Sequence, residues 1–362
     1  MEFVRQVGFL FKKNILYSII LLPRDSQPLV SIIIPVYKTD QYLRRCIDCL
    51  CNQTYHNIEI IAVNDGSPDN CLSILREYEA KDKRVVVFDK ENGGANTARN
   101  YALQRANGNW ISFVDSDDWL DINYYKELMS QAEPDCQLIC GGFRLNENGP
   151  AFSIKQNVFS HDRINAIELL HRVYFGMLYN VWGKVFKKDI IINNNLYFRS
   201  FLRDDGIFLI DYLMHVNNIT IVSTSSYLHY NTENTNSNTH KMYGMDRIML
   251  DLYKYHNSFE KLAESDYSNY DRYMKILYMD KSQSFCNILH ETYPLSFKQR
   301  MYWYKRMIYQ LPYFNLFYLS KFLNKSIHKW LKLAFNVRSP LFIHCIVECH
   351  LIKNRIRSKL HI

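Results

Sequence analysis

The sequence predicts an α/β protein built on a doubly wound, mostly parallel sheet. Strand-like and helix-like segments alternate from residue 29 to residue 118. The strand-like segments are apolar runs rich in β-branched residues, which is typical of strands that helices cover on both faces. Alternation of this kind indicates consecutive right-handed βαβ units.

The first strand is expected at residues 29–37, which read LVSIIIPVY. A helix should follow it, because apolar residues recur at helical spacing from Leu43 to Leu50 and Thr39 or Asp40 can cap the first turn. The next elements continue the alternation. They are expected as strand 58–65, helix 72–78, strand 85–88, a helix near 96–106 opened by Asn92-Gly93-Gly94, and strand 110–114.

Polar residues stand where three of these strands end. They are Tyr37, Asp65 and Asp115. In doubly wound sheets, ligands bind beyond the carboxyl ends of the strands. These side chains are therefore expected to meet in one crevice.

The regular alternation of strand-like and helix-like segments changes near residue 146. Short strands are expected at 138–143, 218–223 and 227–230, with a helix at 164–175, and we interpret this part as the second half of the same domain. From residue 241 the chain reads as helical and aromatic-rich. The expected divisions are an amphipathic leader at 1–27, a domain at 28–240 with halves 28–145 and 146–240, and a helical, basic region at 241–362.

Composition excludes several classes of protein. The chain has 362 residues, of which 48% are hydrophobic and 22% charged, so it is neither collagen-like nor largely disordered. No apolar run approaches the ~20 residues that a membrane-spanning helix needs. The nine cysteines are odd in number and scattered, which favours a reducing compartment. Cys46, Cys49 and Cys51 have no second Cys/His pair at zinc-finger spacing, so we expect thiols rather than a zinc site.

The motifs at the strand ends discriminate between kinds of nucleotide site. Residues 35–40 read PVYKTD, so the first turn lacks a G-x-G-x-x-G fingerprint, and the chain contains no P-loop. A glycine cradle on the first turn is therefore not expected to hold phosphate. Asp115 and Asp117 offer another route, because carboxylates two apart in an extended chain share one face. Such oxygen ligands hold Mg²⁺ or Mn²⁺ together with substrate phosphates.

At this point the chain resembles the family-2 glycosyltransferases of the GT-A fold, over about residues 29–240. It looks most like bacterial members that build capsule, O-antigen or other surface polysaccharides. The resemblance rests on five motifs in order: VSIIIPVY at 30–37, EIIAVNDGS at 59–67, NGGANTARN at 92–100, GNWISFVDSDD at 108–118 and WGKVF at 182–186. It implies a GT-A doubly wound, Rossmann-like mixed sheet with a helical C-terminal extension.

The resemblance also implies a role for each matching residue on the donor side. Tyr37 would lie near the base, Asp65 would accept a hydrogen bond from the uracil N–H, and Asp115 would bind the ribose or diphosphate. The full set of donor-binding residues would be Pro35, Tyr37, Asp65, Gly93, Gly94, Arg99, Asp115 and Ser116.

On the metal side, Asp117 would be the direct ligand with Asp115 beside it. A loosely matching polar loop would add His240, and an imidazole ligand would favour Mn²⁺ over Mg²⁺. Asp204 and Asp205 match a downstream acidic pair that is usually Glu-Asp in the family. Asp205 matches the general base, whereas the role of Asp204 is open because it replaces the usual Glu. Lys184 is expected to fix local structure rather than to bind a phosphate.

These roles describe transfer of a hexose or N-acetylhexosamine from a UDP-sugar to a hydroxyl of a growing surface glycan or lipid-linked acceptor. A carboxylate would remove the acceptor proton, and the metal would neutralise charge on the departing diphosphate. A single base opposite the leaving group implies inversion at the anomeric carbon. Two alternatives stay open: a sugar nucleotidyltransferase, which would need the missing phosphate loop, and a catalytically silent scaffold in a polysaccharide assembly complex.

The positive charge of the chain is concentrated near its C-terminal end. Residues 291–362 hold 13 Lys and Arg against 2 Glu, interleaved with aromatic residues, whereas the net charge of the whole chain is +8. Basic, aromatic amphipathic helices lie flat on anionic bilayers, so we expect a cytoplasmic protein that is peripheral on the inner face of the cell membrane. A helical cap with a solvated basic face is the alternative. No nucleic-acid-binding module is recognisable, so we expect no nucleic-acid partner.

Overall fold

The computed structural model describes residues 27–145, 149–173, 175–199, 204–229, 245–274, 276–277 and 296–310. The expected leader, apart from residue 27, lies outside the described residues. So do His240 and most of the basic region at 291–362.

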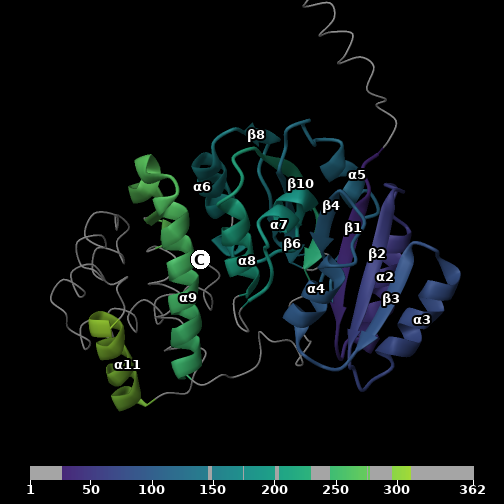
Figure 1. Cartoon of the computed structure of the whole chain (residues 1–362), viewed down its shortest axis with the longest axis horizontal. Helices are drawn as coiled ribbons and strands as arrows, with labels where there is room; N and C mark the ends of the chain where they lie inside the picture. Colours follow the sequence, from purple (N-terminus) through teal and green to yellow (C-terminus); the bar gives the residue numbers. More distant parts are fainter. Residues whose placement is uncertain are drawn as a thin grey trace, which may run out of the picture.

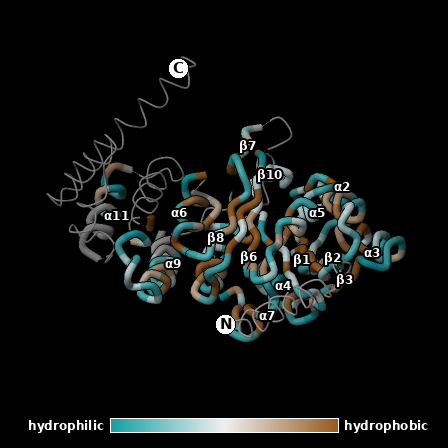
Figure 2. Tube along the Cα trace, turned by 90° about the horizontal axis from the view of Figure 1, so that it is seen from above, coloured by the Kyte–Doolittle hydropathy of each residue, from teal (hydrophilic) through white to brown (hydrophobic). Residues whose placement is uncertain are grey.

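One mixed sheet organises the described chain, and helices pack on both of its faces (Figures 1 and 2). The strand order is β3-β2-β1-β4-β9-β6-β10-β5, with β7 paired to β6 and β8 paired to β10. In chain order the strands are β1 (Val30–Val36), β2 (Ile58–Asp65), β3 (Val85–Lys90), β4 (Trp110–Phe113), β5 (Trp119–Leu120), β6 (Leu138–Leu145), β7 (Ala151–Phe152), β8 (Val158–Ser160), β9 (Lys184–Lys187) and β10 (Ile219–His229).

The helices of the described chain are of two kinds. The α-helices are α2 (Asp40–Cys51), α3 (Cys71–Lys81), α4 (Ala95–Leu103), α5 (Tyr124–Met129), α6 (Arg163–Val173), α7 (Lys188–Asn193), α8 (Asp204–Leu213), α9 (Met245–Glu264) and α11 (Phe297–Gln310). Two short 3₁₀ helices are η1 (Phe175–Leu178) and η3 (Tyr267–Asn269).

The first half of the sheet confirms the predicted alternation. Strands β3, β2, β1 and β4 run parallel, and every residue of β1 and β4 is buried. Hydrophobic residues also line the neighbouring strands β6 and β10 at the centre of the molecule (Figure 2). In α2 the predicted apolar face is buried from Leu43 to Leu50. Thr39 is the N-cap residue of α2, as predicted, but its side chain does not cap the helix, because Thr39 Oγ1 donates instead to Ser116 Oγ at 2.9 Å.

The second half departs from the prediction in its strands. Strand β9 was not predicted, and it runs antiparallel to both β4 and β6, which makes the sheet mixed. The two strands expected at 218–223 and 227–230 are one strand, β10, whose register with β6 shifts between Val222 and Tyr227. The polar, irregular stretch at that shift interrupts the apolar pattern and reads as a break in the sequence. The predicted helix at 164–175 is α6 followed by η1.

Helix α9 packs against α8 on the side away from the sheet (Figure 1). Gly206 permits this contact, because a Cβ there would lie 2.8 Å from Cε2 of Tyr255. The buried Arg163 connects α8 to the segment that follows α9, because it donates to the Leu213 carbonyl at 2.8 Å and to the Tyr273 hydroxyl at 2.9 Å. None of the helices among the described residues has the length and apolarity that crossing a membrane requires.

Candidate functional site

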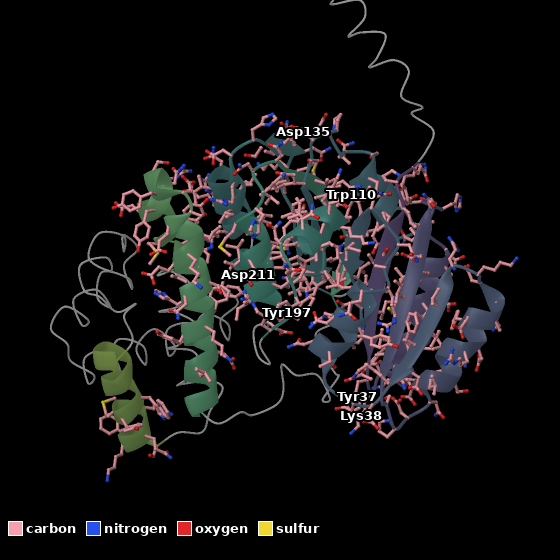
Figure 3. All side chains as sticks on the ribbon, viewed as in Figure 1. Tyr37, Lys38, Trp110, Asp135, Tyr197 and Asp211 are labelled. Atoms are coloured by element: carbon pink, nitrogen blue, oxygen red, sulfur yellow. The ribbon has the colours of Figure 1, made fainter. Side chains whose placement is uncertain are left out.

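The predicted crevice residues lie at the carboxyl edge of the parallel strands. β1 is flanked by β2 and β4, with Val36 paired to Asn64 and Ile33 paired to Phe113. The residues that follow these strands therefore lie side by side, as in other doubly wound sheets. Figure 3 shows Tyr37 and Lys38 together at this lower end of the strands, whereas Asp135 lies at the opposite end.

The carboxylates after β4 lie on a turn rather than on a strand. β4 ends at Phe113, and the Asp118 N–H donates to the Asp115 carbonyl at 3.0 Å. The expectation that Asp115 and Asp117 share a face because the chain is extended is therefore wrong. The turn is fixed instead by side chains: Ser116 accepts from Thr39, and the buried Asp118 accepts from the Tyr227 hydroxyl at 2.7 Å.

Arg99 joins the carboxylates from the two halves of the domain. Its guanidinium is buried and contacts Asp205 Oδ1 at 2.7 Å and Asp115 Oδ1 at 2.9 Å. Asp204 Oδ2 lies 3.7 Å away. Burial alone would disfavour the guanidinium cation, but these carboxylates more than compensate and raise the pKa of Arg99. We call Arg99, Asp115, Asp204 and Asp205 the Arg99 cluster.

The carboxylates of the Arg99 cluster carry more negative charge than one guanidinium neutralises. Burial raises the pKa of Asp115 to about 7 against the opposing effect of Arg99, and Asp118 and Asp205 add to the rise. Burial, together with repulsion by Asp205, raises the pKa of Asp204 to about 8. The cluster would therefore be stabilised by additional positive charge.

These residues fit a divalent cation that a ligand completes. Asp115 and Asp117 are hard oxygen donors and both are partly exposed. No group of three or more His, Cys, Asp or Glu suited to a metal gathers within the described ranges. Two protein carboxylates with phosphate oxygens are the set that Mg²⁺ or Mn²⁺ takes in nucleotide sites. His240 lies outside the described residues.

Asp65 braces the loop between β3 and α4. Its Oδ1 accepts from Lys90 Nζ at 2.5 Å and the Gly93 N–H at 3.0 Å, and its Oδ2 accepts from the Gly94 N–H at 2.7 Å and Asn92 Nδ2 at 3.2 Å. A carboxylate offers about four lone-pair sites, so the loop and Lys90 at the end of β3 together occupy all of them. A nucleobase N–H at Asp65 would have to replace one of these donors. The expected uracil contact thus stays a prediction, whereas the loop contact is observed.

Two stacked phenylalanine rings pack beside the Arg99 cluster. The Phe198 ring lies 5.3 Å from the Arg99 guanidinium carbon and stacks on Phe208, with 4.3 Å between ring centroids. Asn100 fixes the Phe198 backbone twice, accepting from its N–H at 2.9 Å and donating to its carbonyl at 3.0 Å. Sequence reasoning missed both residues. The available signal was the position of Asn100 directly after Arg99 in the motif.

Lys184 lies buried in the centre of the sheet. Its Nζ donates to the Asn180 carbonyl at 3.0 Å, to Asn180 Oδ1 at 2.7 Å and to the Trp182 carbonyl at 3.3 Å. Burial lowers the pKa of Lys184 to about 8, although the nearby Cys140 and Asp205 act to raise it. These contacts agree with the expected structural role.

The other predicted donor residues surround the same edge. Pro35 pairs with Val63 inside the sheet, and Tyr37 follows β1 with its ring partly buried. Gly93 and Gly94 form the loop that Asp65 braces, and Gly94 adopts φ +89°, which suits glycine. The donor-side residues thus lie at or near this edge, and Arg99 connects it to Asp205 at the start of α8.

Comparisons with known proteins agree with this geometry. Residues 31–204 match the profile described as glycosyl transferase family 2. The glycosyltransferase GlyA of Streptococcus pneumoniae is 35% identical over 169 residues, which is 44% of this chain and 24% of GlyA. The uncharacterized glycosyltransferase EpsJ of Bacillus subtilis is 29% identical over 238 residues, which is 63% of this chain and 68% of EpsJ. The match thus spans only about a quarter of GlyA.

A solved structure shares the fold over most of the chain. It is residues 1–349 of TarS from S. aureus in complex with UDP-GlcNAc. The TM-score is 0.68 at 17% identity, covering 90% of this chain and 92% of that one. At this identity the likeness establishes the fold alone, and that fold is GT-A.

Proposed function

Residues 31–204 belong to glycosyl transferase family 2, and on that premise we propose that the protein is an inverting, metal-dependent glycosyltransferase. It would move a hexose or N-acetylhexosamine from a UDP-sugar to a hydroxyl of a surface glycan or lipid-linked acceptor. The observation that carries this proposal is the Arg99 cluster, since one guanidinium holds a carboxylate of the donor edge and a carboxylate of α8 together.

The donor would lie along the carboxyl edge of β1, β2 and β4. Tyr37 would stack on the base, Pro35 would form the pocket floor, and Asp65 would accept the uracil N–H in exchange for one of its loop donors. Gly93, Gly94 and Ser116 would approach the nucleotide through loops that lack bulky side chains at these points. The UDP-GlcNAc bound by TarS motivates a UDP-sugar as the donor class.

A divalent cation, Mn²⁺ or Mg²⁺, would be held by Asp117 and Asp115, with His240 as a further candidate ligand. When bound, it would supply positive charge opposite the diphosphate that leaves. Arg99 donates a hydrogen bond to one oxygen of Asp115 and so fixes the orientation of this carboxylate at the donor edge. Because the described residues offer two carboxylates for the cation, donor and metal should bind together.

The acceptor proton would move to Asp205 Oδ2 or Oδ1 at the start of α8. Arg99 and the stacked pair Phe198 and Phe208 fix this end of the helix, so the base is held in one place. Asp205 would face the anomeric carbon opposite the leaving diphosphate, which gives inversion. Asp204 would stay protonated near neutral pH, because its pKa is raised to about 8 by burial and by Asp205.

Membrane contact through residues 291–362 is part of the proposal. In the described stretch, Phe297 and Tyr302 of α11 are more than half exposed, and Lys298 lies on the same helix. An exposed aromatic and basic helix favours the surface of an anionic bilayer. The protein would then act at the cytoplasmic face, where lipid-linked acceptors are presented.

The donor site is tested by calorimetric titration of UDP in Mn²⁺ and again in EDTA. The wild type should bind UDP in Mn²⁺ only, and Asp117→Asn should lose this binding. Asp135→Asn is the control, because Asp135 lies at the opposite end of the strands and its side chain is 57% exposed. Absence of UDP binding by the wild type would contradict the proposed donor and favour a silent scaffold.

A further inference from the structure

Lys38 has a backbone conformation that a lysine rarely adopts. Its φ is +54°, and among the described residues Asn195 is the other non-glycine residue with positive φ. Asparagine tolerates this left-handed region, whereas a long side chain is strained there. Such strain persists only where surrounding contacts enforce it, and it concentrates at functional sites.

The contacts that enforce this conformation come from the candidate donor edge. The Lys38 N–H donates to Ser67 Oγ at 2.7 Å, and Ser67 in turn donates to Asp69 at 2.5 Å. The next residue, Thr39, donates to Ser116 in the turn that carries Asp115 and Asp117. These contacts fix the backbone of residues 38–39 between the loop after β2 and the proposed metal-binding turn. Figure 3 shows Lys38 at the lower end of the strands.

Among the described residues at this edge, Lys38 is a cation that no ion pair engages. Lys90 is paired with Asp65, and Arg99 is paired within the Arg99 cluster. Within the described part of the chain, no ion pair joins Lys38 to a carboxylate. Its Nζ lies 5.4 Å from the centroid of the Tyr37 ring, so the ammonium stays beside the expected nucleoside pocket.

We propose that Lys38 Nζ binds the diphosphate of the nucleotide donor; this inference rests on the proposed function. Lys90 and Arg99 are committed to carboxylates of the protein, so a diphosphate at this edge needs positive charge beyond theirs. A lysine supplies a point charge that phosphate oxygens accept in any direction. Lys38 lies just after β1, at the end of the strands where that charge is needed (Figure 3).

The test is calorimetric titration of UDP and of uridine, in Mn²⁺, into the full-length wild type and three variants. Lys38→Met should weaken UDP binding by ~10- to 100-fold, the loss expected for one charge-assisted hydrogen bond. Lys38→Arg should recover most of the affinity. Lys83→Met, an exposed lysine before β3 at the opposite edge, should bind UDP as the wild type does. Uridine has no phosphate, so its binding should not change.

Lys38→Gly separates binding from folding. Glycine accepts a positive φ without strain, so this variant should unfold ~2–4 °C higher while its UDP affinity falls as in Lys38→Met. A purely structural lysine would give the reverse, a lower unfolding temperature with unchanged affinity.

Equal UDP affinities of wild type and Lys38→Met would overturn the role of Lys38 and leave the proposed function standing. Failure of the wild type to bind UDP, GDP or dTDP would overturn both.

Discussion

Removal of the Arg99 cation should destabilise the protein in a way that depends on pH. Arg99→Met leaves Asp115, Asp204 and Asp205 together without their counter-ion, and their side chains are 31%, 12% and 18% exposed. Breaking a buried ion pair on one side costs ~3–5 kcal/mol. At ~2–4 °C per kcal/mol for a domain of this size, the unfolding temperature should fall by ~6–20 °C near neutral pH.

The sign of the pH dependence follows from the raised pKa values. A carboxyl group with a raised pKa in the folded state contributes stability that is present below its unfolded pKa and is lost as pH rises through its folded pKa. Asp204 already titrates near 8 because of burial and Asp205, and Arg99 acts to lower that pKa. Without Arg99 the pKa rises further. The penalty of Arg99→Met should therefore be larger at pH 8 than at pH 5.

The assay is thermal unfolding followed by circular dichroism at pH 5 and pH 8, in EDTA. Arg105→Met is the control, because Arg105 is exposed just after α4 and stacks on Tyr101. Its unfolding temperature should change little at either pH. Arg99→Lys should keep much of the stability but lose the fork that orients two carboxylates, so turnover should fall. Equal and small penalties for Arg99→Met at both pH values would refute the reasoning.

Three further predictions concern other parts of the molecule. Asp204→Asn removes the group whose pKa burial and Asp205 raise to about 8, so its unfolding temperature should fall less than that of the wild type from pH 5 to pH 8; parallel profiles would contradict this. Gly206→Ala places a Cβ 2.8 Å from the Tyr255 ring, so it should lower the unfolding temperature by several degrees, and an unchanged value would show that α9 can move away. Removal of residues 291–362 should shift the protein from the membrane to the soluble fraction of a lysate, and an unchanged distribution would exclude bilayer contact through this region.

The parallel half of the fold was predictable because each of its strands has a recognisable local sequence pattern. β1 and β2 are continuous apolar runs, and the helices between them show apolar residues at helical spacing. β9 was missed because it is four residues long and contains two lysines, Lys184 and Lys187. Its place between β4 and β6 depends on pairing with residues more than 40 positions away.

The candidate site was predictable in its residues but not in its connections. Asp65, Arg99, Asp115 and Asp205 were all identified from motifs. The contact between Arg99 and Asp205 spans 106 residues of sequence, and no local pattern records it. The turn at Asp115–Asp118 was misjudged because the strand pattern does not reveal that β4 ends at Phe113. The lysine conformation at position 38 likewise depends on Ser67, in the loop that follows the next strand.

The most direct test of the central claim is release of UDP from a panel of UDP-sugars that includes UDP-GlcNAc, with Mn²⁺ and with candidate glycan acceptors. The wild type and Asp205→Asn are compared after both have been shown to bind UDP. The account predicts that the wild type releases UDP, that EDTA stops the release, and that Asp205→Asn binds the donor but releases UDP at least 100-fold more slowly, within the ~10²–10⁴-fold range of general base catalysis. Equal rates for wild type and Asp205→Asn would contradict Asp205 as the base, and no release from any donor would contradict the enzyme itself.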